Sequence, residues 1–157
     1  MSLQDLGNLG AFIGAVAVVA SLIYLAVQVR QNTRAVLSST QQGLFSTFSE
    51  LSSLVIQNPD VARLLGKIES DPESLSAEDR TRFEWLATRV FGQFENAFAQ
   101  HHDGLLEPKH WDAYAVFYRD AVSSPAFRRF WEGHKPWYFQ DFVAYVDSEV
   151  FDNAPAA

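Results

Sequence analysis

The residues best suited to chemistry are two adjacent histidines, His101 and His102, which precede Asp103. Imidazole and carboxylate groups bind metals and transfer protons, and Glu95 lies seven residues before His102. Metal ligands on one helix usually stand three or four residues apart, whereas adjacent side chains point about 100° apart. The spacing therefore favours histidines that contact the last carbonyls of a helix, with no metal or other cofactor. A membrane-tethered helical enzyme that uses His101, His102 and nearby carboxylates is an alternative hypothesis.

No other motif indicates a catalytic or nucleotide site. The serines lack a G-x-S-x-G pattern, no phosphate-binding glycine loop occurs, and the chain has no cysteine. Glu78 and Asp79 lie where a helix should begin, a position that favours negative charge. With 12 basic and 19 acidic residues, the net charge of −7 disfavours contact with nucleic acid. We therefore expect a protein that is not an enzyme and has no nucleic-acid partner.

The N-terminal part of the chain contains a long uncharged segment. No charged residue lies between Asp5 and Arg30, and residues 6–29 are mostly apolar. As a helix this segment is about 36 Å long, enough to cross a hydrocarbon core of about 30 Å. A signal peptide, a buried core helix and an interfacial helix are the competing interpretations, but residues 1–5 lack the basic charge of a signal peptide. The segment predicts a single transmembrane helix after a short flank of residues 1–5.

Small and polar residues recur along this helix at alternating steps of three and four, a repeat that keeps them on one face. Helices associate in a bilayer by close backbone approach and by side-chain hydrogen bonds, because lipid solvates apolar side chains as well as a second helix does. The repeat therefore predicts a helix-association seam, facing a second copy or another membrane-protein subunit. We call this set the seam: Gly7, Gly10, Gly14, Ala17, Ser21, Tyr24 and Gln28.

Two arginines, Arg30 and Arg34, follow the apolar segment, and no basic residue precedes it. Basic residues concentrate on the cytoplasmic side of membrane helices. This asymmetry predicts a single-pass protein with its C-terminal domain in the cytoplasm. The arginines could serve only this topology, or they could also contact lipid headgroups or a partner at the membrane surface.

The rest of the chain predicts helices and no strands. Residues 30–58 should form a juxtamembrane helix, either separate from the span or continuous with it, which ends at Asn58 and Pro59. Residues 59–150 should form a helical domain, with a strongly amphipathic helix over 77–100 that is capped by Ser76. Further helices should begin near Pro108 and Pro125 and over 137–150, and residues 151–157 should form a flexible tail. The predicted fold class is all-α, with an N-terminal transmembrane helix and a helical bundle.

The start of the chain, LGNLGAFIGAVAVVASLIYLAVQVRQNTRAV, resembles the opening of a group of small bacterial membrane proteins. These proteins share a single span followed by V/I-R-Q-N-T-R-A, and no activity is assigned to them. The resemblance covers roughly the first 35 residues and implies an anchor in the bacterial inner membrane. With the seam, it favours a membrane-anchored interaction or scaffold protein that self-associates or serves a larger complex. The alternative is an oligomeric pore or transport component lined by Ser21, Gln28 and Asn32.

Overall fold

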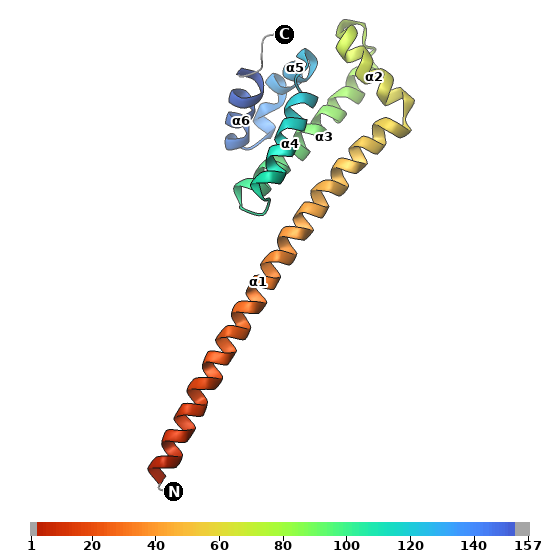
Figure 1. Cartoon of the computed structure of the whole chain (residues 1–157). Coiled ribbons are helices and arrows are strands. Elements are labelled where there is room, and N and C mark those ends of the chain that lie inside the picture. The colour runs from red at the N-terminus through yellow and green to blue at the C-terminus, as the bar shows by residue number, and fades with distance from the viewer. Residues whose placement is uncertain (1–2, 153–157) are drawn as a thin grey trace. The chain divides into compact units, whose positions relative to one another are not determined.

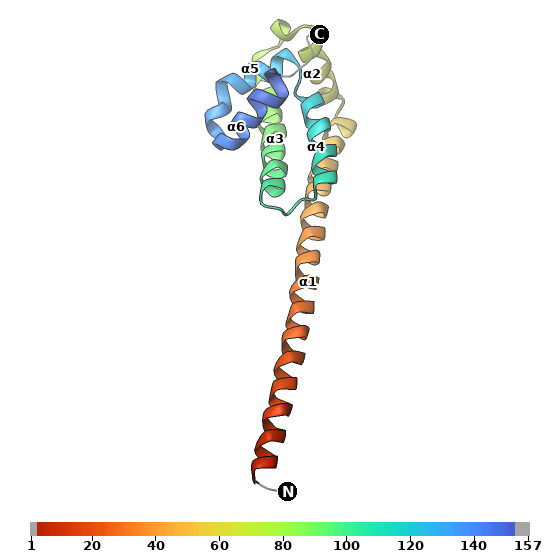
Figure 2. The same ribbon diagram turned by 60° about the vertical axis from the view of Figure 1, so that its left-hand side comes forward.

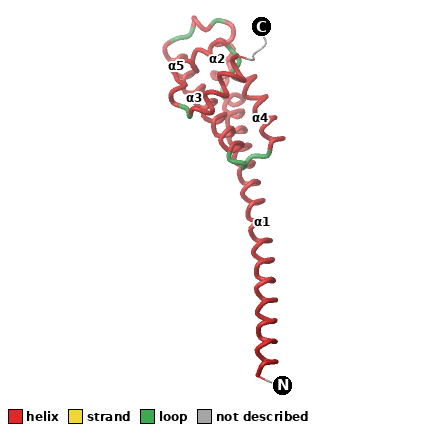
Figure 3. The backbone as a smooth tube through the Cα atoms, turned by 90° about the vertical axis from the view of Figure 1, so that its left-hand side faces the viewer, coloured by secondary structure: helices red, strands yellow, loops and turns green. Residues whose placement is uncertain are grey.

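A computed structural model describes residues 3–152, and every regular element within that range is helical (Figure 3). The predicted all-α fold class is confirmed. The chain divides into two compact units, Met1–Ser39 and Thr40–Ala157, and we call the second the helical domain. In chain order (Figure 1) the elements are α1 (Leu3–Gln57), α2 (Pro59–Ser70), the short 3₁₀ turn η1 (Pro72–Ser74), α3 (Ala77–His102), α4 (Pro108–Ala121), α5 (Pro125–His134), the 3₁₀ turn η2 (Lys135–Trp137), α6 (Gln140–Val146) and the π-helical turn η3 (Asp147–Asp152).

Helix α1 is longer than the predicted span because nothing in its sequence interrupts it. It begins at Leu3, so residues 3–5 of the expected flank are already helical, and it ends at Gln57. Proline cannot donate a backbone hydrogen bond, and Pro59 keeps the residue before it out of the helical region. Asn58 accordingly has φ −121° and ψ 97°, and its side-chain amide donates to the carbonyl of Leu54 at 2.8 Å.

The second part of α1 belongs to the helical domain and not to a separate juxtamembrane segment. Leu44 and Leu51 are buried, and the ring of Phe48 meets that of Phe117 edge to face at 4.7 Å between centroids. Nearby, the guanidinium of Arg89 donates to the carboxylate of Glu50 at 3.3 Å. The domain therefore starts about twenty residues earlier than predicted, because this stripe of α1 is part of its core.

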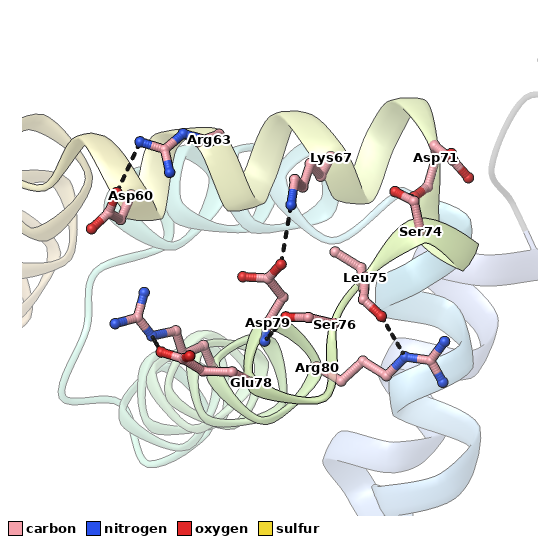
Figure 4. A network of polar contacts seen from close by, with 11 residues as sticks. Asp60, Arg63, Lys67, Asp71, Ser74, Leu75, Ser76, Glu78, Asp79 and Arg80 are labelled. Atoms are coloured by element: carbon pink, nitrogen blue, oxygen red, sulfur yellow. Dashed lines mark hydrogen bonds and ion pairs between the residues drawn. The ribbon is translucent and has the colours of Figure 1, made fainter.

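An ion pair and several hydrogen bonds join α2 and the η1 connection to the start of α3 (Figure 4). The ammonium of Lys67 lies 3.1 Å from the carboxylate of Asp79, and this hydrogen bond is the main cause that lowers the pKa of Asp79. The Asp79 backbone N–H donates to the Ser76 hydroxyl at 3.1 Å, as the predicted N-cap requires. Arg80 donates to the carbonyl of Leu75 at 3.2 Å. These contacts hold the η1 connection so that α2 packs beside α3 and α5.

The core of the domain is built around α3, against which α4, α5 and α6 pack. Helices α3 and α4 run antiparallel, and Gly104, with φ +71°, makes the turn that ends α3 (Figure 2). The largest fully buried side chains are aromatic and aliphatic: Trp131, Phe91, Phe94, Phe142, Val122 and Val146. The apolar face predicted for residues 77–100 is confirmed, since the residues it buries include Phe83, Leu86, Ala87, Val90, Phe91, Phe94 and Ala97.

The C-terminal end differs from the prediction in two ways. The last α-helix begins at Gln140 and not at Trp137, because Lys135, Pro136 and Trp137 form the 3₁₀ turn η2. The expected tail from residue 151 is wrong for its first residue, since Phe151 is 7% exposed and carries the guanidinium of Arg128 over its ring. An aromatic ring buries enough apolar area to hold the chain end in the core. Residues 153–157 of the predicted tail lie outside the described part of the chain.

Two tyrosine hydroxyls in the core allow a matched test of this packing. The Tyr138 hydroxyl is buried and finds no hydrogen-bond partner among the described residues, whereas that of Tyr118 donates to the Gln93 side chain at 3.4 Å. Removing an unsatisfied hydroxyl relieves a desolvation cost, while removing a bonded one leaves its partner unsatisfied. We expect Tyr138→Phe to leave the free energy of unfolding unchanged or raised, and Tyr118→Phe to lower it by about 1 kcal/mol. Chemical denaturation of both variants measures the difference, and a larger loss for Tyr138→Phe would contradict this packing.

The same tyrosines should make the domain sensitive to alkaline pH. Burial raises the pKa of both Tyr118 and Tyr138 to about 12. The unfolded chain ionises near pH 10, so above that pH the unfolded state binds fewer protons and the free energy of unfolding falls. For Tyr118, which is 2% exposed, the expected loss is about 1.4 kcal/mol per pH unit between pH 10 and 12. Thermal unfolding followed across this range should show a flatter decline in Tyr118→Phe, and equal slopes would exclude Tyr118 as the cause.

Candidate functional site

The seam lies on the first unit of the chain, within α1. At about 100° of rotation per residue, its seven members fall within an arc of about 100°. Two hydrogen bonds link seam residues that are four positions apart. The Ser21 hydroxyl donates to the Ala17 carbonyl at 2.8 Å, and the Gln28 amide donates to the Tyr24 hydroxyl at 2.7 Å. Every seam residue is exposed. The structure therefore places the predicted residues on a single exposed face.

The polar side chains in and near the apolar segment bond largely within their own helix. Besides Ser21, Thr33 donates its hydroxyl to the Val29 carbonyl at 3.0 Å. A polar group in hydrocarbon must find such a partner, because no water is present to replace it. Among the described residues Asn32 forms no hydrogen bond, and the amide oxygen of Gln28 accepts none. Gln28 therefore keeps an acceptor and one N–H for a group outside the described residues.

Among the described residues nothing packs against the glycines of the seam. A methyl group placed on Gly7, Gly10 or Gly14 would meet nothing within 4 Å. Glycine inside a helix costs about 1 kcal/mol relative to alanine in water, so three such residues weaken the helix without any gain in intrachain packing. They leave a strip of bare backbone that a second helix can approach closely.

Arg30 and Arg34 follow the apolar segment one helical turn apart. Both are exposed, and neither guanidinium pairs with a carboxylate among residues 3–152. Side chains at this spacing share one side of a helix. Both charges are therefore available to water, to lipid phosphates or to a partner.

The histidines at the end of α3 contact aromatic rings and a loop carbonyl, and not the last carbonyls of their own helix as the spacing predicts. The ring of His101 stacks on Trp111 at 5.0 Å between centroids, and its Nδ1 lies 3.5 Å from the Leu106 carbonyl. His102 stacks on Phe98 at 6.2 Å. Glu95 does not join them, because its carboxylate accepts the backbone N–H of Phe139 at 2.9 Å. Among the described residues no group of three or more histidine and acidic side chains could hold a metal ion.

The helical domain also contains a groove that the sequence did not reveal. Its volume is about 440 Å³, and residues of α1, α2, α3, α4 and α5 line it. The floor is apolar, and the acidic side chains of Glu69 and Asp120 stand at its edge. The Ser124 hydroxyl also lies on its wall, inaccessible to solvent and without a hydrogen-bond partner in the described structure. No local pattern could predict this groove, since its residues come from helices far apart in the sequence.

Searches of protein-family models, curated proteins and solved structures gave no match to this chain.

Chelation should not affect the folding of this protein. The contacts of His101 and His102 are to aromatic rings and a carbonyl, so we expect no metal to stabilise the end of α3. EDTA should leave the thermal unfolding temperature unchanged, and elemental analysis of protein purified without chelator should give less than one metal ion per ten chains. A stoichiometric metal that is lost together with stability would instead revive the enzyme hypothesis.

Proposed function

We propose that this protein is a membrane-anchored helical protein that associates with other membrane helices through the seam. Its partner is a second copy of the chain or another subunit of a larger complex. The observation that carries the proposal is the contrast along one face of α1. The glycines leave bare backbone, and the Gln28 amide keeps free hydrogen-bonding groups.

The anchoring part of the proposal rests on the length and exposure of the apolar segment. Within α1 an 18-residue window is long and apolar enough to cross a membrane, and none of that window is buried. A core helix of a soluble protein would be mostly buried. Exposed apolar area costs about 25 cal/mol per Å² in water, and Phe12, Ile13 and Leu22 are all more than half exposed. A bilayer removes this cost for the whole segment.

The association part rests on what attracts helices to one another in lipid. Apolar side chains gain little by meeting there, so close backbone contact and hydrogen bonds must supply the attraction. Gly10 and Gly14 provide the closest approach, in a G-x-x-x-G spacing. Two copies related by a two-fold axis would bring their Gln28 side chains to the same level, where amides can bond to each other.

The orientation and the membrane are further parts of this proposal. Arg30 and Arg34 follow the apolar segment and form no ion pair among the described residues, which supports a cytoplasmic location for the helical domain. The resemblance of residues 6–36 to single-span bacterial proteins supports the inner membrane.

The pore alternative receives less support from these contacts. A wet lumen needs polar groups that face water or ions. The Ser21 hydroxyl donates to its own helix, and Gln28 gives one N–H to Tyr24. Of the three residues proposed to line a pore, Asn32 alone lies outside these bonds.

Substitutions on two sides of the helix test the association. In Gly10→Leu/Gly14→Leu, two branched side chains would cover the bare backbone and keep a second helix away. The control Ala15→Leu/Ala26→Leu adds comparable bulk on the other side of the helix. We expect light scattering of the full chain in mild detergent to show at least a tenfold weaker assembly for the glycine variant only. Equal assembly of both variants would contradict a role for the seam.

The absence of cysteine allows a second measurement in native membranes. A single cysteine introduced as Gly14→Cys should form a disulfide-linked dimer on mild oxidation, whereas Ala15→Cys should remain monomeric. Equal cross-linking at both positions would show random collision. A chain that is monomeric in both assays would exclude self-association and leave only the complex with another subunit, which gentle extraction and mass spectrometry would identify.

A further inference from the structure

We infer that the groove of the helical domain binds a small organic cation with an apolar body, such as an amine or a quaternary ammonium compound. This site lies within the second unit and is separate from the seam. The inference combines the charge at the edge of the groove with the character of its floor.

The edge of the groove carries negative charge without a counterion. Glu69 lies in the last turn of α2 and Asp120 in the last turn of α4, where the helix dipole already presents its negative end. A carboxylate in that position is unfavourable, and neither residue forms an ion pair within the described chain. The negative potentials of two side chains and two helix ends therefore meet at one groove.

The basic residues in those two helix turns are bonded to other groups. Lys67 of α2 bonds to Asp79 at 3.1 Å, and Arg119 of α4 donates to the Tyr145 hydroxyl at 2.8 Å. No lysine or arginine is among the residues that line the groove. An external cation would relieve the repulsion that the chain itself leaves in place.

The apolar floor of the groove favours a ligand with an apolar body over a bare ion. Leu51, Ile68, Leu86, Val90 and Phe127 line it and are all buried residues. Hydrated metal ions gain nothing from such a floor, and they need more oxygen ligands than two carboxylates supply. A volume of about 440 Å³ lies within the range of small-molecule sites.

An aromatic ring of the groove also fits a ligand of this kind. The ring of Phe117, which is 39% exposed, lines the groove and can attract a cation through its π face. An anion would gain nothing from this π face and would be repelled by the carboxylates.

Benzyltrimethylammonium is a suitable probe, with benzenesulfonate and benzyl alcohol as the anionic and neutral ligands of similar size. Titration calorimetry on the full chain in a non-ionic detergent should show saturable binding of the cation. Its affinity should exceed that of either comparison ligand by at least about tenfold, a difference of about 1.4 kcal/mol. Equal affinity for all three ligands, or no binding of the cation, would overturn the inference.

Variants of the two carboxylates locate the binding. Glu69→Gln/Asp120→Asn should weaken binding of the cation by about tenfold or more. The control Glu84→Gln/Asp112→Asn makes the same charge change on exposed residues away from the groove. It should change the affinity for the cation less than twofold. The groove variant should also unfold at a higher temperature than the parent without probe, because the repulsion at both helix ends is removed. A lower unfolding temperature, or equal weakening by the control, would overturn the inference.

A third variant tests the floor independently of charge. Ala121 is exposed and lines the groove, so Ala121→Trp should fill it while leaving both carboxylates in place. We expect loss of cation binding with an unchanged unfolding transition. Undiminished binding would show that the carboxylates attract the probe at the open surface only, and the groove would then have no role.

Discussion

The helical domain depends on the burial of one aromatic face of α3. Phe91 lies 4.8 Å from Trp131 and 5.8 Å from Phe130 between ring centroids, and Phe94 lies 4.8 Å from Tyr118 and 5.3 Å from Phe142. Each such ring pair adds about 0.5–1.5 kcal/mol to the free energy gained by burying apolar area. Since these partners belong to α4, α5 and α6, the position of every one of those helices is determined by a ring that it sends to α3.

Polar contacts at the edge of this core orient the helices that the rings hold. The indole N–H of Trp131 donates to the Asp147 carboxylate at 2.7 Å, which joins α5 to the last turn of the chain. Lys135 lies 3.5 Å from the same carboxylate and 3.0 Å from Glu132, and these contacts raise the pKa of Lys135. The ion pair between Lys67 and Asp79 orients α2 in the same way as these contacts orient α5. Lys67 is thereby bonded to Asp79, and Glu69, in the same last turn of α2, forms no ion pair among the described residues.

The two units treat their apolar side chains differently. The helical domain buries a core of large apolar side chains, although Ile56, Trp85 and Trp137 stay exposed, whereas the apolar segment of α1 exposes its side chains and bonds most of its polar ones within the helix. A chain with a near-neutral mean hydropathy of −0.08 therefore carries both an aromatic-rich core and a helical segment, residues 6–29, without charge. Under our proposals the first unit takes part in recognition between helices in lipid, and the second binds a small ligand in water.

The sequence by itself determined the features that depend on neighbours along the chain. The uncharged segment, the Ser76 cap, the proline helix starts and the apolar face of residues 77–100 all follow from spacings within one or two turns. The common face of the seam residues was predictable for the same reason, because a helix maps sequence spacing directly onto its faces.

Only the tertiary structure decided the rest, because side chains from distant helices had to meet first. Glu95 precedes His102 by seven residues in the sequence, but its carboxylate accepts the backbone N–H of Phe139. The predicted tail became core at Phe151 because the domain offered the ring a buried position. The groove, its two carboxylates and the unpartnered Ser124 hydroxyl come from five helices, and no periodicity within any one helix encodes which of the others it will face.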